Sequence, residues 1–198
     1  MSNLNKINTK QICLLQVLPH LNSGGMVSGA VEISNFLKNK GGKSIIVSSG
    51  GYREQELLKN NASIIHLPVE TKNPFLIYLN KNRLKKIILK YNVNIVHARS
   101  RAPAWSAYLA AKETKTSFIT TFHGTYGTEN LVKKKYNSVM LKGDYTIAIS
   151  KFIKKHIEEE YKKSNNIYVI ARGINEKVFS PKSVTTARII SAAKKIKT

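Results

Sequence analysis

Short apolar runs of strand length alternate with helical patterns along the whole chain of 198 residues. The runs carry few polar residues, as strands buried on both faces do. This alternation predicts an α/β protein with a Rossmann-like, doubly wound, mostly parallel sheet and helices on both faces. We expect strands at 12–18, 44–49, 63–67, 94–98, 117–122, 145–149 and 167–171. We expect helices at 29–40, 54–60, 73–91, 103–112, 129–141, 151–163 and 183–195.

The charge of the chain restricts its partners. Lys and Arg number 33 against 11 Asp and Glu, so the formal net charge is +22. This excess favours an anionic partner, whether a phosphate-bearing substrate, an anionic lipid or nucleic acid. A lysine-rich genomic composition accounts equally well for part of it, because Asn and Ile are also abundant. We rank nucleic acid last and expect no nucleic-acid partner, since aromatic residues do not interleave with the basic runs.

Several kinds of site are excluded by what the chain lacks. Asp144 is the only aspartate, so a D-x-D pair holding a metal on a sugar nucleotide cannot form. Cys13 is the only cysteine, which excludes an internal disulfide and a Cys-rich zinc site. We expect no metal and no cofactor. No run of about 18 uncharged apolar residues occurs, and 12–18 reads poorly as a signal peptide, so we expect a cytoplasmic protein.

The candidate site residues follow the predicted strands. Ligands of doubly wound sheets bind beyond the carboxyl ends of the strands, where this chain offers arginines, histidines and glycines but no carboxylate. That set suits a phosphate or another anion. Its members are Gly24, Gly25, Arg99, Arg101, His123, Tyr126, Arg172 and Gly173.

Each candidate has a plainer interpretation. Gly24-Gly25 lacks the G-x-G-x-x-G spacing, which disfavours a dinucleotide enzyme and leaves a tight turn possible. His123 can donate to a sugar or phosphate, or it can be a strand-end histidine satisfied by backbone. Arg99 and Arg101 bind an anion or are solvated loop charges. Among the remaining residues, we expect His66 and His97 to be structural, His156 to be solvated and Ser150 to cap a helix.

A basic helix between residues 129 and 141 carries Lys133, Lys134 and Lys135 beside Leu131 and Val132. Such a helix can lie on an anionic bilayer, with its lysines reaching lipid phosphates. It can also be an ordinary surface helix whose apolar face covers the sheet. We favour membrane attraction for its charge and packing for its apolar face.

Five segments, together with the glycine pair, resemble one family. They are 95–100 (IVHARS), 121–124 (TFHG), 147–150 (IAIS), 169–175 (VIARGIN) and 179–181 (FSP). In this order they resemble the N-terminal half of a family 4 retaining glycosyltransferase of the GT-B fold. The likeness is greatest to lipopolysaccharide-core sugar transferases of alphaproteobacteria.

The resemblance implies roles for the candidate residues. Gly24 and Gly25 would approach the donor diphosphate, and His123 would contact the transferred sugar and assist catalysis. Arg99, Arg101 and Tyr126 would line the acceptor side. Arg172-Gly173 begins a segment that matches a turn near the domain crossover, whose usual sequence in the family is Asn-Gly-Val-Asp. Arg172 and Asn175 differ from that sequence.

The resemblance also implies an activity and a domain plan. Residues 1–182 would form the acceptor-side domain, and 183–198 would begin the connection to a C-terminal donor-binding domain. The implied activity is metal-independent hexosyl transfer from a nucleotide sugar to a lipid-linked saccharide of the lipopolysaccharide core. The protein would be peripheral on the inner face of the cytoplasmic membrane. We expect the chain alone to be nearly inactive, as a fragment, a truncated product or half of a split enzyme with a separate C-terminal half. The alternatives are a non-catalytic membrane- or acceptor-binding module and, third, a nucleic-acid-binding protein.

Overall fold

A computed structural model describes residues 8–59, 62–127, 129–173, 180 and 184–196. Within this part of the chain, seven strands form one parallel sheet in the order β3-β2-β1-β4-β5-β6-β7. The order reverses direction between β1 and β4, which makes the sheet doubly wound and confirms the predicted fold class. The strands are β1 (Cys13–Val17), β2 (Lys43–Ser48), β3 (Ser63–His66), β4 (Ile95–Ala98), β5 (Ser117–Phe122), β6 (Tyr145–Ala148) and β7 (Ile167–Val169).

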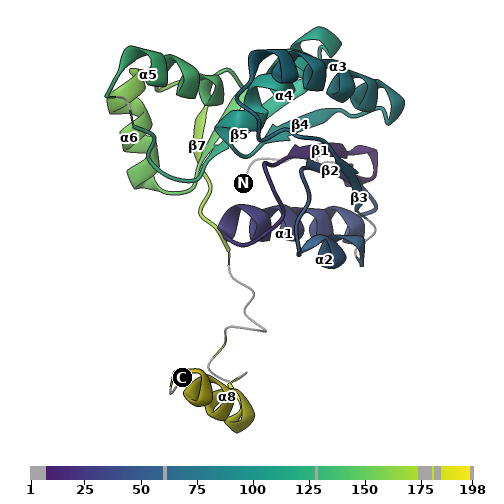
Figure 1. Cartoon of the computed structure of the whole chain (residues 1–198), viewed down its shortest axis with the longest axis vertical. Coiled ribbons are helices and arrows are strands. Elements are labelled where there is room, and N and C mark those ends of the chain that lie inside the picture. Colours follow the sequence, from purple (N-terminus) through teal and green to yellow (C-terminus); the bar gives the residue numbers. More distant parts are fainter. Residues whose placement is uncertain (1–7, 60–61, 128, 174–179, 181–183, 197–198) are drawn as a thin grey trace, which may run out of the picture.

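Helices cover both faces of the sheet (Figure 1). On one face lie α1 (Gly25–Asn39) and α2 (Glu54–Leu58), and on the other lie α3 (Pro74–Lys90) and α4 (Arg101–Thr114). Beyond them along the chain come α5 (Leu131–Asn137) and α6 (Lys151–Tyr161), with short 3-10 turns at Thr9–Gln11 and Ser138–Leu141. Two buried apolar clusters result. The larger joins the sheet to α3, α4 and α6, and the smaller joins it to α1 and α2.

Local capping sets where the helices begin. The Asn73 side chain accepts hydrogen bonds from the amides of Phe75 and Leu76, and Pro74 takes the first helical position. Ser150 accepts from the Ile153 amide at 3.2 Å, which confirms the predicted cap.

Two predicted helix starts are wrong, and both errors lie at the working edge of the sheet. The first helix begins at Gly25 rather than at residue 29, after Gly24 turns the chain with φ +102°. The fourth begins at Arg101 rather than at Pro103. The predicted first helix omits a turn that contains the buried Val27, because the glycines on either side of this turn are poor helix formers. The prediction opens the fourth helix at Pro103, which stands third in that helix. Gly25 and Arg101 are therefore held by helices and not by loops.

The last described helix, α8 (Thr186–Ile196), lies apart from the sheet and its covering helices (Figure 1). The predicted domain boundary at 182–183 falls outside the described residues, as do Ile174, Asn175 and the 179–181 motif except for Ser180. Over the described ranges, no helix combines the length and apolar content that a membrane crossing requires.

Candidate active site

A cavity of about 190 Å³ opens at the carboxyl ends of β4, β5 and β6. Its polar lining comes from elements far apart in the sequence. The contributing side chains are Glu32 of α1, His97 and Arg99 from the end of β4, Thr121 and His123 from the end of β5, and Arg172 beyond β7. The cavity therefore lies where the fold predicts a ligand, at the edge where the strand order reverses.

Arg99 is a buried cation and not a solvated loop charge, since only 4% of the residue is exposed. Its Nε donates to Gln16 Oε1 at 2.9 Å and its Nη2 to the Gly29 carbonyl at 3.4 Å. Both partners are neutral. Burial, reinforced by the nearby Arg172 and opposed by the Glu32 carboxylate of the same cavity, lowers the pKa of Arg99 to about 10, so the group stays charged at neutral pH. A buried positive charge whose hydrogen bonds go to neutral oxygens attracts an anion strongly.

His123 stands beside this charge with a neutral ring. Burial, followed by the charges of Arg172 and Arg99, lowers the pKa of His123 to about 3. The Arg172 guanidinium donates to Nδ1 of His123. A guanidinium has no acceptor, so Nδ1 must be the acceptor and the proton of the neutral ring is assigned to Nε2. Nε2 is buried and has no hydrogen-bond partner among the described residues. The site thus holds a neutral donor whose N–H is not committed to another protein group.

Arg172 also meets the start of α1. A side chain added at Gly25 would overlap the Arg172 guanidinium, so the absence of a Cβ there lets the arginine reach the first turn. The amino end of a helix carries unpaired amides and partial positive charge. Gly25 therefore leaves room for the Arg172 guanidinium, and the expected approach of a donor diphosphate to Gly24 and Gly25 stays a prediction.

The predicted acceptor residues separate into two groups. Arg99 lies in the cavity with His123. Arg101 instead stacks on the Tyr126 ring with 4.4 Å between guanidinium carbon and ring centroid, and its Nη1 donates to Asn137 Oδ1 at 3.1 Å. Tyr126 packs on Phe122 with ring centroids 4.8 Å apart. Burial raises the pKa of the Tyr126 hydroxyl, opposed by Arg101. Arg101 thus lines a neighbouring pocket, and the Tyr126 ring supports its guanidinium by stacking.

The three lysines of the basic helix have separate surroundings. Lys133 pairs with Glu129 at 2.9 Å on the surface. The Lys134 ammonium lies 5.9 Å from the Tyr161 ring centroid, while Lys135 is exposed.

Sequence reasoning missed two residues near the site. Glu32 lines the cavity from α1, although it read as an ordinary surface position of a helix. His156 was expected to be solvated, and this is wrong, because its Nε2 accepts from the Tyr126 amide at 3.2 Å. Glu32 and His156 lie near the site because their helices pack there, and a motif at the end of one strand does not predict that packing.

His97 and His66, which we expected to be structural, each have a side-chain partner. His97 bonds Thr121 Oγ1 at 2.7 Å, and His66 pairs with Glu54 at 3.0 Å. Within the described ranges, no group of three His, Cys, Asp or Glu side chains is placed to hold a metal.

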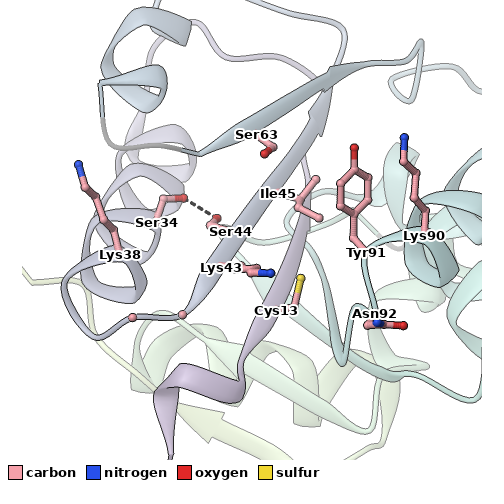
Figure 2. A pocket seen from close by; sticks show the side chains of 12 residues that line it. Cys13, Ser34, Lys38, Lys43, Ser44, Ile45, Ser63, Lys90, Tyr91 and Asn92 are labelled. Carbon is pink, nitrogen blue, oxygen red and sulfur yellow. Dashed lines mark hydrogen bonds between the residues drawn. The ribbon is translucent and has the colours of Figure 1, made fainter.

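A second pocket, of about 490 Å³, lies at the opposite edge of the sheet, where β1, β2 and β3 begin. Figure 2 shows Lys38, Lys43 and Lys90 spread around it without converging on one point. The Lys38 ammonium donates to the Lys59 carbonyl at 3.4 Å, and Ser34 and Ser44 bond each other at 2.8 Å. Its polar groups are engaged locally, so this pocket lacks the convergent charge of the carboxyl-edge cavity.

The neutral histidines predict a stability loss in acid. An unfolded histidine has a pKa near 6.5, whereas burial holds the pKa of His97 well below that value and that of His123 at about 3. The unfolded chain therefore binds more protons between these limits, and the free energy of unfolding falls as pH falls below about 6.5. Each histidine contributes up to about 1.4 kcal/mol per pH unit. Urea unfolding at pH 7.5 and pH 5.0 should show a smaller acid loss for His123→Asn than for the wild type, and equal losses would contradict the assignment.

A doubly wound parallel domain with a cationic cavity at its switch point has the architecture of one half of a GT-B glycosyltransferase. The family model for Glycosyltransferase Family 4 matches residues 23–178, and the chain belongs to that family. The match includes every predicted site residue. A comparison with curated proteins gives no significant match.

Solved structures agree on the fold. A glycosyltransferase from Rickettsia africae ESF-5 is 44% identical with a TM-score of 0.80, over 94% of this chain and 49% of that protein. Anabaena Alr3699/HepE, solved with UDP and glucose, is 10% identical with a TM-score of 0.70, over 92% and 50%. The lipopolysaccharide outer core galactosyltransferase WaaB is 17% identical with a TM-score of 0.60, over 82% and 46%. The chain thus spans about half the length of each of these proteins.

Proposed function

We propose that the chain is the acceptor-side half of an enzyme that transfers a hexosyl group from a nucleotide sugar to a lipid-linked saccharide. The observation that carries the proposal is the cavity in which buried Arg99, neutral His123 and Arg172 converge. Nucleotide sugars are the donors that fit a cationic cavity beside a hydrogen-bond donor, since they join a diphosphate to a polyhydroxyl group. UDP and glucose in the HepE structure support this donor class.

Different residues would contact different parts of the donor. Arg172 and the first turn of α1 at Gly24-Gly25 would attract the diphosphate. Arg99, held by its hydrogen bond to Gln16, would add a positive charge to the cavity. The His123 Nε2–H would donate to a hydroxyl of the transferred sugar, the step for which its neutral state suits it. Arg99 is positioned before the donor arrives, so its charge needs little reorganisation at the moment of transfer, whereas the His123 ring must shift to present its buried Nε2–H to the sugar.

Sugar transfer can proceed with retention of the anomeric configuration and without a protein nucleophile. The bond between the anomeric carbon and the diphosphate oxygen breaks, and the acceptor hydroxyl oxygen bonds the same carbon from the same side. The leaving diphosphate takes the hydroxyl proton. The protein then contributes orientation and charge stabilisation, both of which the cavity offers.

The proposed acceptor is a saccharide of the lipopolysaccharide core, and the proposed place of action is the inner face of the cytoplasmic membrane. The likeness to WaaB and the exposed basic residues of α5 support this choice. We propose residues 1–182 as the acceptor-side domain and 183–198 as the start of a connection to a donor-binding domain. The half-length coverage of the solved structures supports that division.

Transfer of labelled sugar from UDP-glucose and UDP-galactose to a truncated lipopolysaccharide acceptor tests the proposal. The chain is assayed alone and followed by a donor-binding domain. We expect turnover only from the longer protein. Efficient turnover by the 198 residues, abolished in His123→Ala, would overturn the need for a second domain. No turnover from the longer protein, with vesicle binding intact, would favour the non-catalytic module.

A further inference from the structure

Two adjoining hollows lie on the face formed by α3, α4 and α5, next to the active-site cavity. The first has a volume of about 620 Å³, and its lining combines basic side chains with apolar surface. The second has a volume of about 350 Å³ and is mostly apolar. Lys72 and Tyr136 line both hollows, so the two are continuous across these residues.

The first hollow, which we term the basic pocket, brings together Lys72, Arg101 and Lys133 from three parts of the chain. No carboxylate belongs to its lining. The nearest ion pair joins Lys133 to Glu129, whose side chain is 73% exposed at the rim and is readily screened by water. Arg101 is held by Asn137 and by the Tyr126 ring. Three cations with one exposed acid suit a doubly charged anion such as a phosphate monoester.

The second hollow, which we term the apolar groove, is built from rigid side chains. Trp105 is fixed because its Nε1 donates to the Tyr136 carbonyl at 3.1 Å, and its ring lies 6.3 Å from that of Tyr136. The groove is therefore formed before any ligand enters. Hydrocarbon is the chemistry that such a surface accepts. The groove is otherwise lined by Pro74, Ile77, Tyr78 and Leu109.

Large apolar side chains stand exposed around these hollows. Leu131 and Val132 at the start of α5 are 84% and 80% exposed, so the packing predicted for them is wrong, and Phe75 at the start of α3 is 69% exposed. Lysines lie beside them at 72, 133 and 135. Exposed apolar residues mixed with lysines are typical of a surface that rests on an anionic bilayer.

We propose that this face binds a membrane lipid that carries a phosphate monoester next to its hydrocarbon chains. The phosphate lies between Lys72, Arg101 and Lys133, and a chain lies along the apolar groove. Arg101 stacks on Tyr126 in the loop that follows His123, which places the lipid beside the catalytic cavity. The inference rests on the proposed function only in naming this lipid as part of the acceptor.

Short-chain lipids that stay monomeric allow the two hollows to be tested separately. The dissociation constant for dihexanoyl phosphatidic acid is measured by calorimetry on the 198-residue chain. Glycerol 3-phosphate supplies the phosphate without chains, and dihexanoyl phosphatidylcholine supplies chains without a monoester. We expect phosphatidic acid to bind at least about tenfold more tightly than either, which corresponds to about 1.4 kcal/mol.

Matched variants separate the site from bulk charge. Lys72→Ala/Lys133→Ala should weaken phosphatidic acid binding about tenfold. Lys43→Ala/Lys90→Ala removes the same charge around the pocket of Figure 2 and should change it less than about twofold. If both double variants weaken phosphatidic acid binding equally, the binding depends on net charge alone and the proposal is overturned.

Two further outcomes would also overturn the proposal. If glycerol 3-phosphate binds as tightly as phosphatidic acid, the apolar groove does not bind the lipid chain and would have another occupant, such as a protein domain. Equal affinity for phosphatidylcholine would remove the basic pocket. The measurement needs neither donor nor turnover, so its failure is distinguishable from failure of sugar transfer.

Discussion

In the proposed transferase with a donor-binding domain, His123→Ala should lower kcat/KM for sugar transfer by about 10²- to 10³-fold. The imidazole is neutral, its Nδ1 accepts from Arg172, and its Nε2–H has no partner within the described part of the chain. Alanine removes this donor from the position where the sugar would lie. Because the interaction strengthens as the transition state forms, we expect the loss mainly in kcat rather than in KM. Initial rates over a range of donor concentrations measure both.

His66→Ala is the control for this loss. His66 carries the same ring but lies at the end of β3, where its side chain is 59% exposed and pairs with Glu54. We expect its kcat and KM to stay within about twofold of the wild type. Equal losses in the two variants, or a loss at His123 confined to KM, would show that the ring does not act on the transferred sugar.

The positions of the strands along the chain follow from local sequence because each strand is a compact apolar run. The fifth strand, predicted at 117–122, is observed at Ser117–Phe122. The run is closed on one side by Lys115, which ends α4 in the left-handed conformation, and on the other by the polar loop at His123. Signals of this kind lie within a few residues of the element they define, so one sequence is sufficient to read them.

The charges of the site are less predictable because their environment is built by distant contacts. Arginine is almost never fully buried unless it is paired, and Arg99 is buried because Gln16, 83 positions away, accepts from it. Burial, followed by the charge of Arg172 at a separation of 49 residues, lowers the pKa of His123. The sequence located the candidates at the correct edge. Only the packing shows that Arg99 joins His123 while Arg101 lines the basic pocket.

Phe122 connects the stability of the fold to the position of the His123 ring. It is the last residue of β5, is fully buried, and contacts the rings of Tyr126 and Tyr161 with centroids 4.8 and 6.3 Å away. His123 is its immediate neighbour in the chain. A change at Phe122 therefore acts on the core and on the loop that carries His123.

Phe122→Ala should lower the free energy of unfolding of the chain by about 3–5 kcal/mol. The substitution removes a whole buried ring and leaves a cavity among aromatic neighbours that are held on separate elements, so collapse can fill little of it. Phe152→Ala is the matched control, because Phe152 is 69% exposed on α6 and should change stability by no more than about 0.5 kcal/mol. Urea unfolding followed by circular dichroism measures both variants. A loss below about 1 kcal/mol at Phe122, or similar losses at the two positions, would show that β5 does not anchor the site through this ring.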